Sequence, residues 1–262
     1  MVPVIDSHCH LDMIEERGIP RDEIKQQLRD NQITAVAHIA ADLSGVKYIE
    51  NFEKEEWPCA IFYTLGRHPG EAHENDGYDG LAEIANHAKD KNFKAIGEIG
   101  LDYYYHKDTR EIQIKTFEKY LEAALEYQKP VCIHTREAYD DTYQILKQVS
   151  DKIPVLIHCF TGNKEEMYGF LDLGFYISFS GIVTFKNADN VREAAIACPV
   201  NQMIVETDAP FLAPVPKRGK TNQPAYVRHT LDFLAEKRNE NIESFAQTIY
   251  NNTVKFYGLE GL

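Results

Sequence analysis

The sequence lacks any long apolar run, and no stretch approaches the ~18 consecutive apolar residues that a membrane-spanning helix needs. The first residues, Met1 to Asp6, carry no basic segment of the kind that opens a secretory signal. Proline- or serine-rich linkers and low-complexity tracts are also absent. We therefore expect a cytoplasmic protein without membrane contact, in which residues 1–262 form a single domain.

The chain has only five cysteines, which is an odd number. Most of them, such as Cys132 and Cys159, lie within or beside apolar segments, where a thiol behaves as a small hydrophobic group. This usage argues against a disulfide framework and favours a reducing, intracellular compartment.

Acidic residues outnumber basic ones. The chain has 41 aspartates and glutamates but only 28 lysines and arginines, which gives a formal net charge of -13. Such a balance argues against a protein whose main role is to coat nucleic acid or an anionic membrane. It does not exclude a nuclease, because a bound divalent cation can reverse the field locally.

What the sequence does contain is a series of short apolar segments that alternate with helix-like segments. Strands are expected near 2–5, 33–40, 59–65, 95–100, 130–133, 154–157, 175–179 and 203–205. Helices are expected near 20–31, 43–56, 81–90, 109–128, from 135 onward, 165–173, 190–198, 224–237 and 242–257. Eight such alternations in a chain of this length predict an α/β fold, the (β/α)₈ TIM barrel, with its active site at the carboxyl ends of the strands.

Metal-ligand residues follow five of the predicted strands. They are His8, His10, Glu98, His134, His158 and Asp208. Parallel strands bring these side chains to one face of the barrel, where nitrogen and oxygen ligands without a nearby cation imply a metal. Six ligands exceed what one ion with open positions needs. We therefore predict two divalent ions, with Mg²⁺, Mn²⁺ or Zn²⁺ as candidates, bridged by Glu98.

Two metal ions a few Å apart stabilise both the attacking and the leaving oxygen of a phosphodiester displacement. Glu98 and Asp208 are the candidate catalytic residues, with Asp208 as the acceptor of the water proton. Asp6 and Asp12 flank the first two histidines and are expected to orient them.

Other residues are candidates for substrate contact or for the core. His68 follows the third strand and is a candidate substrate-binding residue, whereas His38 lies mid-strand and is expected in the core. Three adjacent tyrosines, Tyr103 to Tyr105, could stack on bases or simply pack over the barrel mouth. The candidate phosphate-binding cations are Arg136, Lys217, Arg218 and Lys220.

Four motifs resemble the signatures of the TatD family of metal-dependent deoxyribonucleases. They are His8-Cys9-His10-Leu11-Asp12, Gly97-Glu98-Ile99-Gly100-Leu101-Asp102-Tyr103, His158-Cys159-Phe160-Thr161-Gly162 and Glu206-Thr207-Asp208-Ala209-Pro210. The resemblance implies a TIM barrel of the amidohydrolase group. It assigns one ion to His8, His10, Glu98 and Asp208, and the other to Glu98, His134 and His158. Gly70 departs from the family, which commonly has histidine or a bulky residue after the His-Pro of that loop.

The leading hypothesis is a divalent-metal-dependent deoxyribonuclease that removes nucleotides from DNA ends and contacts DNA locally at the barrel mouth. One alternative is a hydrolase of ester or amide bonds, such as an aminoacyl-tRNA deacylase or an amidohydrolase, because the same chemistry attacks carbonyl carbon. A metal-stabilised binding protein would need a closed coordination shell, and ligands spread around a barrel mouth suit an open one better. No obligate protein partner is indicated.

Overall fold

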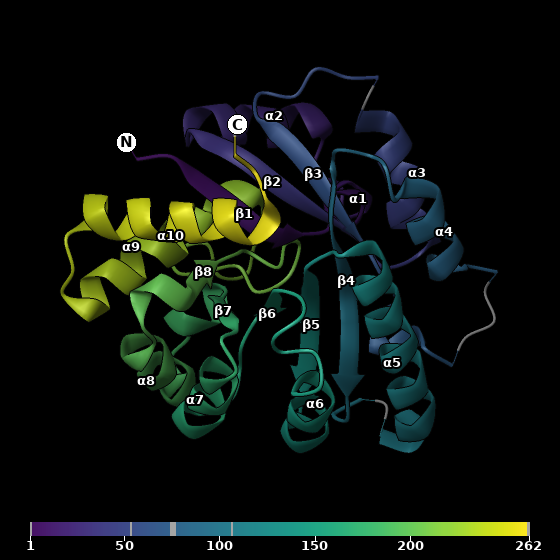
Figure 1. The fold of residues 1–262 in the computed structure, drawn as a ribbon. Helices are drawn as coiled ribbons and strands as arrows, with labels where there is room; N and C mark the ends of the chain where they lie inside the picture. Colours follow the sequence, from purple (N-terminus) through teal and green to yellow (C-terminus); the bar gives the residue numbers. More distant parts are fainter. Residues whose placement is uncertain (1, 53, 74–76, 106, 261–262) are drawn as a thin grey trace.

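The computed structural model describes residues 2–52, 54–73, 77–105 and 107–260 (Figure 1). Its strands are β1 (Val4–Cys9), β2 (Ile33–Ala40), β3 (Ala60–Leu65), β4 (Phe93–Asp102), β5 (Val131–Arg136), β6 (Val155–Ile157), β7 (Tyr176–Phe179) and β8 (Met203–Val205). They pair in parallel in chain order, so each strand lies beside its neighbour in sequence. The predicted (β/α)₈ barrel is confirmed.

Helices cover the outside of the strands (Figure 1). They are α1 (Leu11–Glu16), α2 (Arg21–Asp30), α3 (Leu43–Phe52), α4 (Gly80–His87), α5 (Arg110–Tyr127), α6 (Tyr139–Leu146), α7 (Lys164–Asp172), α8 (Asp189–Ala197), α9 (Val227–Arg238) and α10 (Ile242–Tyr257). The predicted helix at 109–128 is α5, whose apolar stripe of Phe117, Leu121 and Ala124 is buried. Among the described residues, no helix has the length and apolarity to cross a membrane.

The barrel closes where the end of β8 returns to β1. Asp208 N–H donates to His8 O at 2.9 Å, and His10 N–H donates to Ala209 O at 2.7 Å. The buried Asp6 carboxylate accepts from the Thr207 N–H at 2.8 Å and from its hydroxyl at 2.6 Å. Asp6 Oδ1 also lies 3.5 Å from the His8 backbone N–H, so this carboxylate holds the backbone of β1 and not the histidine rings that we expected it to orient. It fastens the two strand ends that carry them.

Residues 135–137 do not begin a helix, contrary to our prediction. β5 instead continues to Arg136, and α6 begins only at Tyr139. The extension is stabilised by β4, because β4 runs on to Asp102 and pairs that residue with Arg136. Tyr103 N–H also donates to Arg136 O at 2.9 Å. The longer strand places the Arg136 side chain at the barrel mouth.

His38 lies in the core, as predicted. Its ring is fully buried, its Nδ1 accepts from Leu11 N–H at 3.3 Å, and its Nε2 lies 3.0 Å from Gly45 O. These two contacts require the neutral tautomer that carries its proton on Nε2. Burial accordingly lowers the pKa of His38 from 6.5 to about 4.

This shift predicts a loss of stability in mild acid. The unfolded chain binds a proton at His38 below pH 6.5, whereas the folded chain does so only near pH 4. The free energy of unfolding should therefore fall as the pH drops between those values, by on the order of 3 kcal/mol from this group. In urea titrations, a His38→Gln variant should lose less stability than the wild type over that range. Parallel pH profiles would contradict the assignment.

Candidate metal centre

Glu98 occupies the centre of the site, near the carboxyl end of β4, and is only 4% exposed. Gly97 and Gly100 lie on either side of Glu98, where β4 approaches β5 closely. A Cβ atom on Gly97 would lie 2.7 Å from Cys132 Cβ, and one on Gly100 would lie 2.0 Å from His134 O. Only glycine permits this spacing of the strands, and the spacing brings Glu98 within reach of His134.

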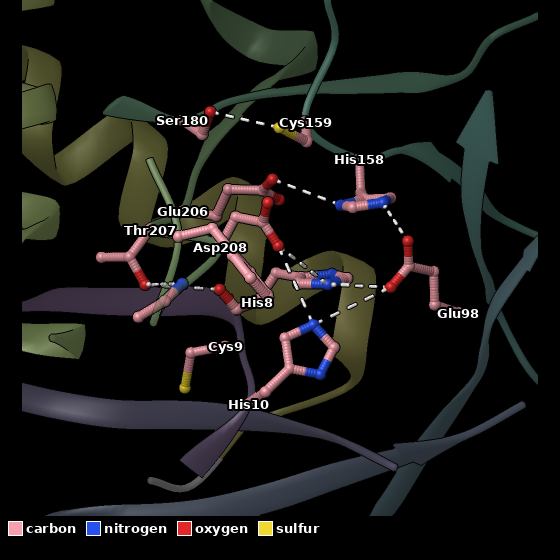
Figure 2. A network of polar contacts seen from close by, with 12 residues as sticks. His8, Cys9, His10, Glu98, His158, Cys159, Ser180, Glu206, Thr207 and Asp208 are labelled. Atoms are coloured by element: carbon pink, nitrogen blue, oxygen red, sulfur yellow. Dashed lines mark hydrogen bonds and ion pairs between the residues drawn. The ribbon is translucent and has the colours of Figure 1, made fainter. Parts of the chain in front are cut away.

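The two carboxylate oxygens of Glu98 face different imidazoles (Figure 2). Its Oε1 lies 2.8 Å from His134 Nδ1 and 2.8 Å from His158 Nε2. Its Oε2 lies 3.4 Å from His8 Nε2 and 3.9 Å from His10 Nε2. The carboxylate therefore contacts two histidines through each oxygen, while the rings of His8 and His158, one from each pair, stack 4.0 Å apart.

Asp208 joins the group on the Oε2 side. Its Oδ1 lies 3.7 Å from His8 Nε2 and 3.8 Å from His10 Nε2. Its backbone adopts a left-handed conformation, with φ of 56°, which aspartate tolerates better than most residues. The structure thus brings together all six predicted ligands around the Glu98 carboxylate. Their assignment to individual ions stays a prediction.

Two further carboxylates orient the ligand histidines, and neither was assigned a role from the sequence. Asp102 Oδ2 lies 3.2 Å from His134 Nε2, and Glu206 Oε1 lies 3.4 Å from His158 Nδ1. Such contacts fix the orientation of the ring and raise its basicity as a ligand. For Asp102 the available signal was its spacing of four residues after Glu98, because even spacings on a strand point to one face. Glu206 lies beyond the end of β8, where this rule does not apply.

The charge of Glu98 is stabilised by its neighbours. Burial alone would raise its pKa, but the imidazoles outweigh this effect, His158 foremost, and hold the pKa of Glu98 well below its usual range. Asp208 differs, since burial raises its pKa to about 6. Burial also lowers the pKa of His10 to about 3, so this ring is neutral, as a metal ligand must be.

The buried imidazole of His8 provides a test of whether the site suits a metal ion. Neither of its ring nitrogens has a hydrogen-bond partner among the described residues. Buried polar atoms are nearly always satisfied, so an orphaned imidazole beside two carboxylates indicates a missing ligand. Three groups of three could hold an ion: His8, His10 and Glu98; His8, His158 and Glu206; and His68, Glu98 and His134. The residues fit a metal centre.

His68 lies closer to the ligands than the sequence indicated. Its Nε2 is 3.7 Å from Glu98 Oε1, while its Nδ1 accepts from Gly70 N–H at 3.0 Å. It lines the same cavity as the ligands, as does Arg136. This cavity has a volume of about 1160 Å³ and lies at the carboxyl ends of the strands.

The basic loop at 217–220, which we predicted to bind phosphate, lies outside the lining of this cavity. Lys217, Arg218 and Lys220 are not among the residues that line the cavity. Lys217 Nζ lies 4.8 Å from the centre of the Tyr226 ring, and Arg218 Cζ lies 3.7 Å from that of Phe185. The structure therefore does not join this loop to the metal centre, and its contact with DNA stays a prediction.

A barrel with histidine and carboxylate ligands at the carboxyl ends of its strands defines a metal-dependent hydrolase. The model of the family described as TatD related DNase matches residues 5–258. The chain belongs to this family, as its motifs indicated.

Relatives with this architecture cover nearly the whole chain. The uncharacterized metal-dependent hydrolase YcfH of Escherichia coli is 38% identical over 98% of this chain and 96% of its own length. YabD of Bacillus subtilis, also named an uncharacterized metal-dependent hydrolase, is 31% identical over 97% of this chain and 98% of its own. The crystal structure of YJJV, a TatD homologue from Escherichia coli, matches with a TM-score of 0.86 and 24% identity. That match covers 97% of this chain and 98% of the homologue, and it supports the fold alone.

The close approach of β4 and β5 generates a prediction. In Gly100→Ala, the new methyl group would overlap His134 O, so the strands must separate, at a cost of about 1–3 kcal/mol in unfolding free energy. His134 would move with its backbone, so metal affinity should fall as well. Denaturant titration and metal titration measure the two effects.

Gly18→Ala is the matched control, because Gly18 also has a positive φ but has open space around its Cβ position. It should lose stability only through backbone strain and should keep its metal affinity. Equal metal affinities in the two variants would show that the Gly100 contact does not position His134.

Proposed function

We propose that this protein is a divalent-metal-dependent deoxyribonuclease that hydrolyses phosphodiester bonds at DNA ends, with two ions at the site. The main support for the proposal is the position of the Glu98 carboxylate. Each of its two oxygens faces a different pair of imidazoles. Such a carboxylate suits a bridge between two ions. The cavity, with a volume of about 1160 Å³, lies near the upper end of the usual range for ligand sites and is compatible with the end of a polymeric substrate.

The residues divide the work as follows. His8, His10, Glu98 and Asp208 would hold one ion, and Glu98, His134 and His158 the other. When bound, two divalent ions would polarise the scissile phosphate and lower the pKa of the attacking water. Glu98 fixes the separation between the two groups of ligands, while Asp102 and Glu206 hold the rings of His134 and His158 in orientation.

Asp208 is the proposed acceptor of the proton from the attacking water. Its side chain is 17% exposed and lines the cavity, so it is accessible to water and substrate. In the metal-free protein burial raises its pKa to about 6, so the carboxylate is ionised at neutral pH and can accept a proton.

The test of this function is a direct assay of the metal-free protein after addition of Mg²⁺, Mn²⁺ or Zn²⁺. End-labelled DNA and aminoacyl-tRNA are offered as alternative substrates. The proposal expects metal-dependent shortening of DNA from its ends. Release of the amino acid without shortening of DNA would instead identify a hydrolase of carboxylic esters.

Replacement of Glu98 should abolish activity with every metal. Glu98→Ala removes the carboxylate whose two oxygens lie nearest to both groups of histidines, so both ions should be lost. A Glu137→Gln variant is the matched control, because Glu137 lines the cavity but is exposed. Retention of more than about a tenth of the wild-type rate in Glu98→Ala would refute the bridging role, because both ions are needed for the displacement.

Replacement of Asp208 should separate catalysis from metal binding. Asp208→Asn keeps the shape and one ligand oxygen but loses the base, so the rate should fall ~10²-fold or more, the usual scale for a general base. Metal affinity should weaken only modestly. Metal titration and turnover are measured on the same preparation, with Asp140→Asn on the cavity rim as control. Parallel losses of both quantities would indicate a ligand role alone.

A further inference from the structure

Two exposed tyrosines lie at the edge of the cavity, close to the metal centre but outside its ligands. Tyr104 is 53% exposed and Tyr105 is 65% exposed, and both line the cavity. Large aromatic surfaces of this kind are normally buried, so their exposure at a substrate cavity requires an explanation.

The Arg136 guanidinium lies on both rings. Its Cζ is 4.0 Å from the centre of the Tyr104 ring and 4.7 Å from that of Tyr105. No carboxylate or carbonyl oxygen among the described residues accepts a hydrogen bond from this guanidinium. Stacking holds the group in place while its N–H donors stay available.

This lack of a hydrogen-bond partner sets Arg136 apart on an acidic chain. Side-chain hydrogen bonds to protein oxygens are donated by Arg21, Arg29, Arg67, Arg110, Arg192, Arg218, Arg228 and Arg238. The remaining exception is Arg17, which lies 4.5 Å from the ring centre of Phe211, another residue of the cavity. With 41 carboxylate side chains in the chain, an unpaired arginine at the cavity indicates an anionic ligand from outside.

The stack is fixed to the metal centre through Asp102. Its Oδ1 accepts from the backbone N–H groups of Tyr104, at 2.9 Å, and Tyr105, at 3.0 Å. Its Oδ2 contacts His134, at 3.2 Å. One carboxylate therefore positions both a metal ligand and the two aromatic rings, and Arg136 follows His134 by two residues on β5.

We propose that Tyr104 and Arg136 form a nucleotide subsite beside the scissile phosphate, in which a base stacks on the face of the Tyr104 ring opposite the guanidinium and the guanidinium binds the adjacent phosphate. The inference rests on the proposed nuclease function and assigns the contacts that hold the substrate. Base stacking on an aromatic ring tolerates every base, so the subsite would select for a nucleotide without selecting its sequence. In this proposal the subsite, which lines the cavity, contacts DNA nearer to the metal centre than the basic loop at 217–220, which does not line it.

The first experiment pairs a protein variant with a change in the substrate. Tyr104→Ala and Tyr104→Phe are compared with the wild type on an oligonucleotide, and on the same oligonucleotide with abasic nucleotides at one end or the other. Tyr104→Ala should lower kcat/KM about tenfold on the normal substrate, mainly through KM, because a stacked base is lost. When the abasic nucleotides are at the end that the enzyme attacks, Tyr104→Ala and the wild type should have equal kcat/KM. Tyr104→Phe should behave as the wild type.

The matched control is Tyr168→Ala, because Tyr168 on α7 is 43% exposed but does not line the cavity. It should have no effect on either substrate. An equal loss in Tyr104→Ala on normal and abasic substrates would overturn the proposal, as would no loss on either.

The phosphate contact is tested by salt dependence. Arg136→Met should flatten the slope of log affinity against log salt by about 0.7, the value for one phosphate contact on a single strand. Arg29→Met, outside the cavity, should leave the slope unchanged. An unchanged slope in Arg136→Met would exclude the guanidinium from phosphate binding.

A binding measurement keeps the subsite distinguishable from the nuclease function. A phosphorothioate oligonucleotide with terminal 2-aminopurine is titrated with the metal-loaded protein, and stacking should quench its fluorescence. Quenching by the wild type and not by Tyr104→Ala, in a protein that cleaves no DNA, would refute the nuclease function and support the subsite. Cleavage with equal quenching by both proteins would refute the subsite alone.

Discussion

The site depends on one buried carboxylate that is surrounded by imidazoles. Burial of the Glu98 carboxylate costs roughly several kcal/mol, and only close positive or polar partners can offset this cost. His134 and His158 supply the shortest contacts, at 2.8 Å each, and His8 approaches the other oxygen. The same arrangement that stabilises the charge also shapes the metal centre.

Barrel closure gives this arrangement its rigidity. Two of the ligand histidines come from the β1 end and Asp208 from the β8 end, so the site forms only when the ends of the sheet meet. The Asp6–Thr207 hydrogen bonds fasten that junction within the core. Glu98 faces both this junction and His158, which follows β6 (Figure 2). It also contacts His134 on β5, so it links opposite sides of the barrel mouth. Folding and ligand geometry are therefore coupled.

The sequence predicted the barrel because each strand is a short apolar segment, and five of the eight strands lead into a predicted metal ligand. Residues 33–40 and 203–205 were placed without error, since their apolar runs are bounded by polar turns. The start of α6 was misplaced because strand pairing with β4 extends β5 to Arg136, and pairing between distant segments has no local signal. The role of Asp6 was misread for the same reason, because its partner Thr207 lies far away in the sequence.

Crystallographic anomalous difference maps of the protein loaded with Mn²⁺ or Zn²⁺ test the central claim most directly. The claim is that Glu98 joins two ions, each held by its own group of histidines. It predicts two peaks about 3.5–4 Å apart, one on each oxygen of Glu98. A single peak at full occupancy, or two peaks that do not share Glu98, would contradict it.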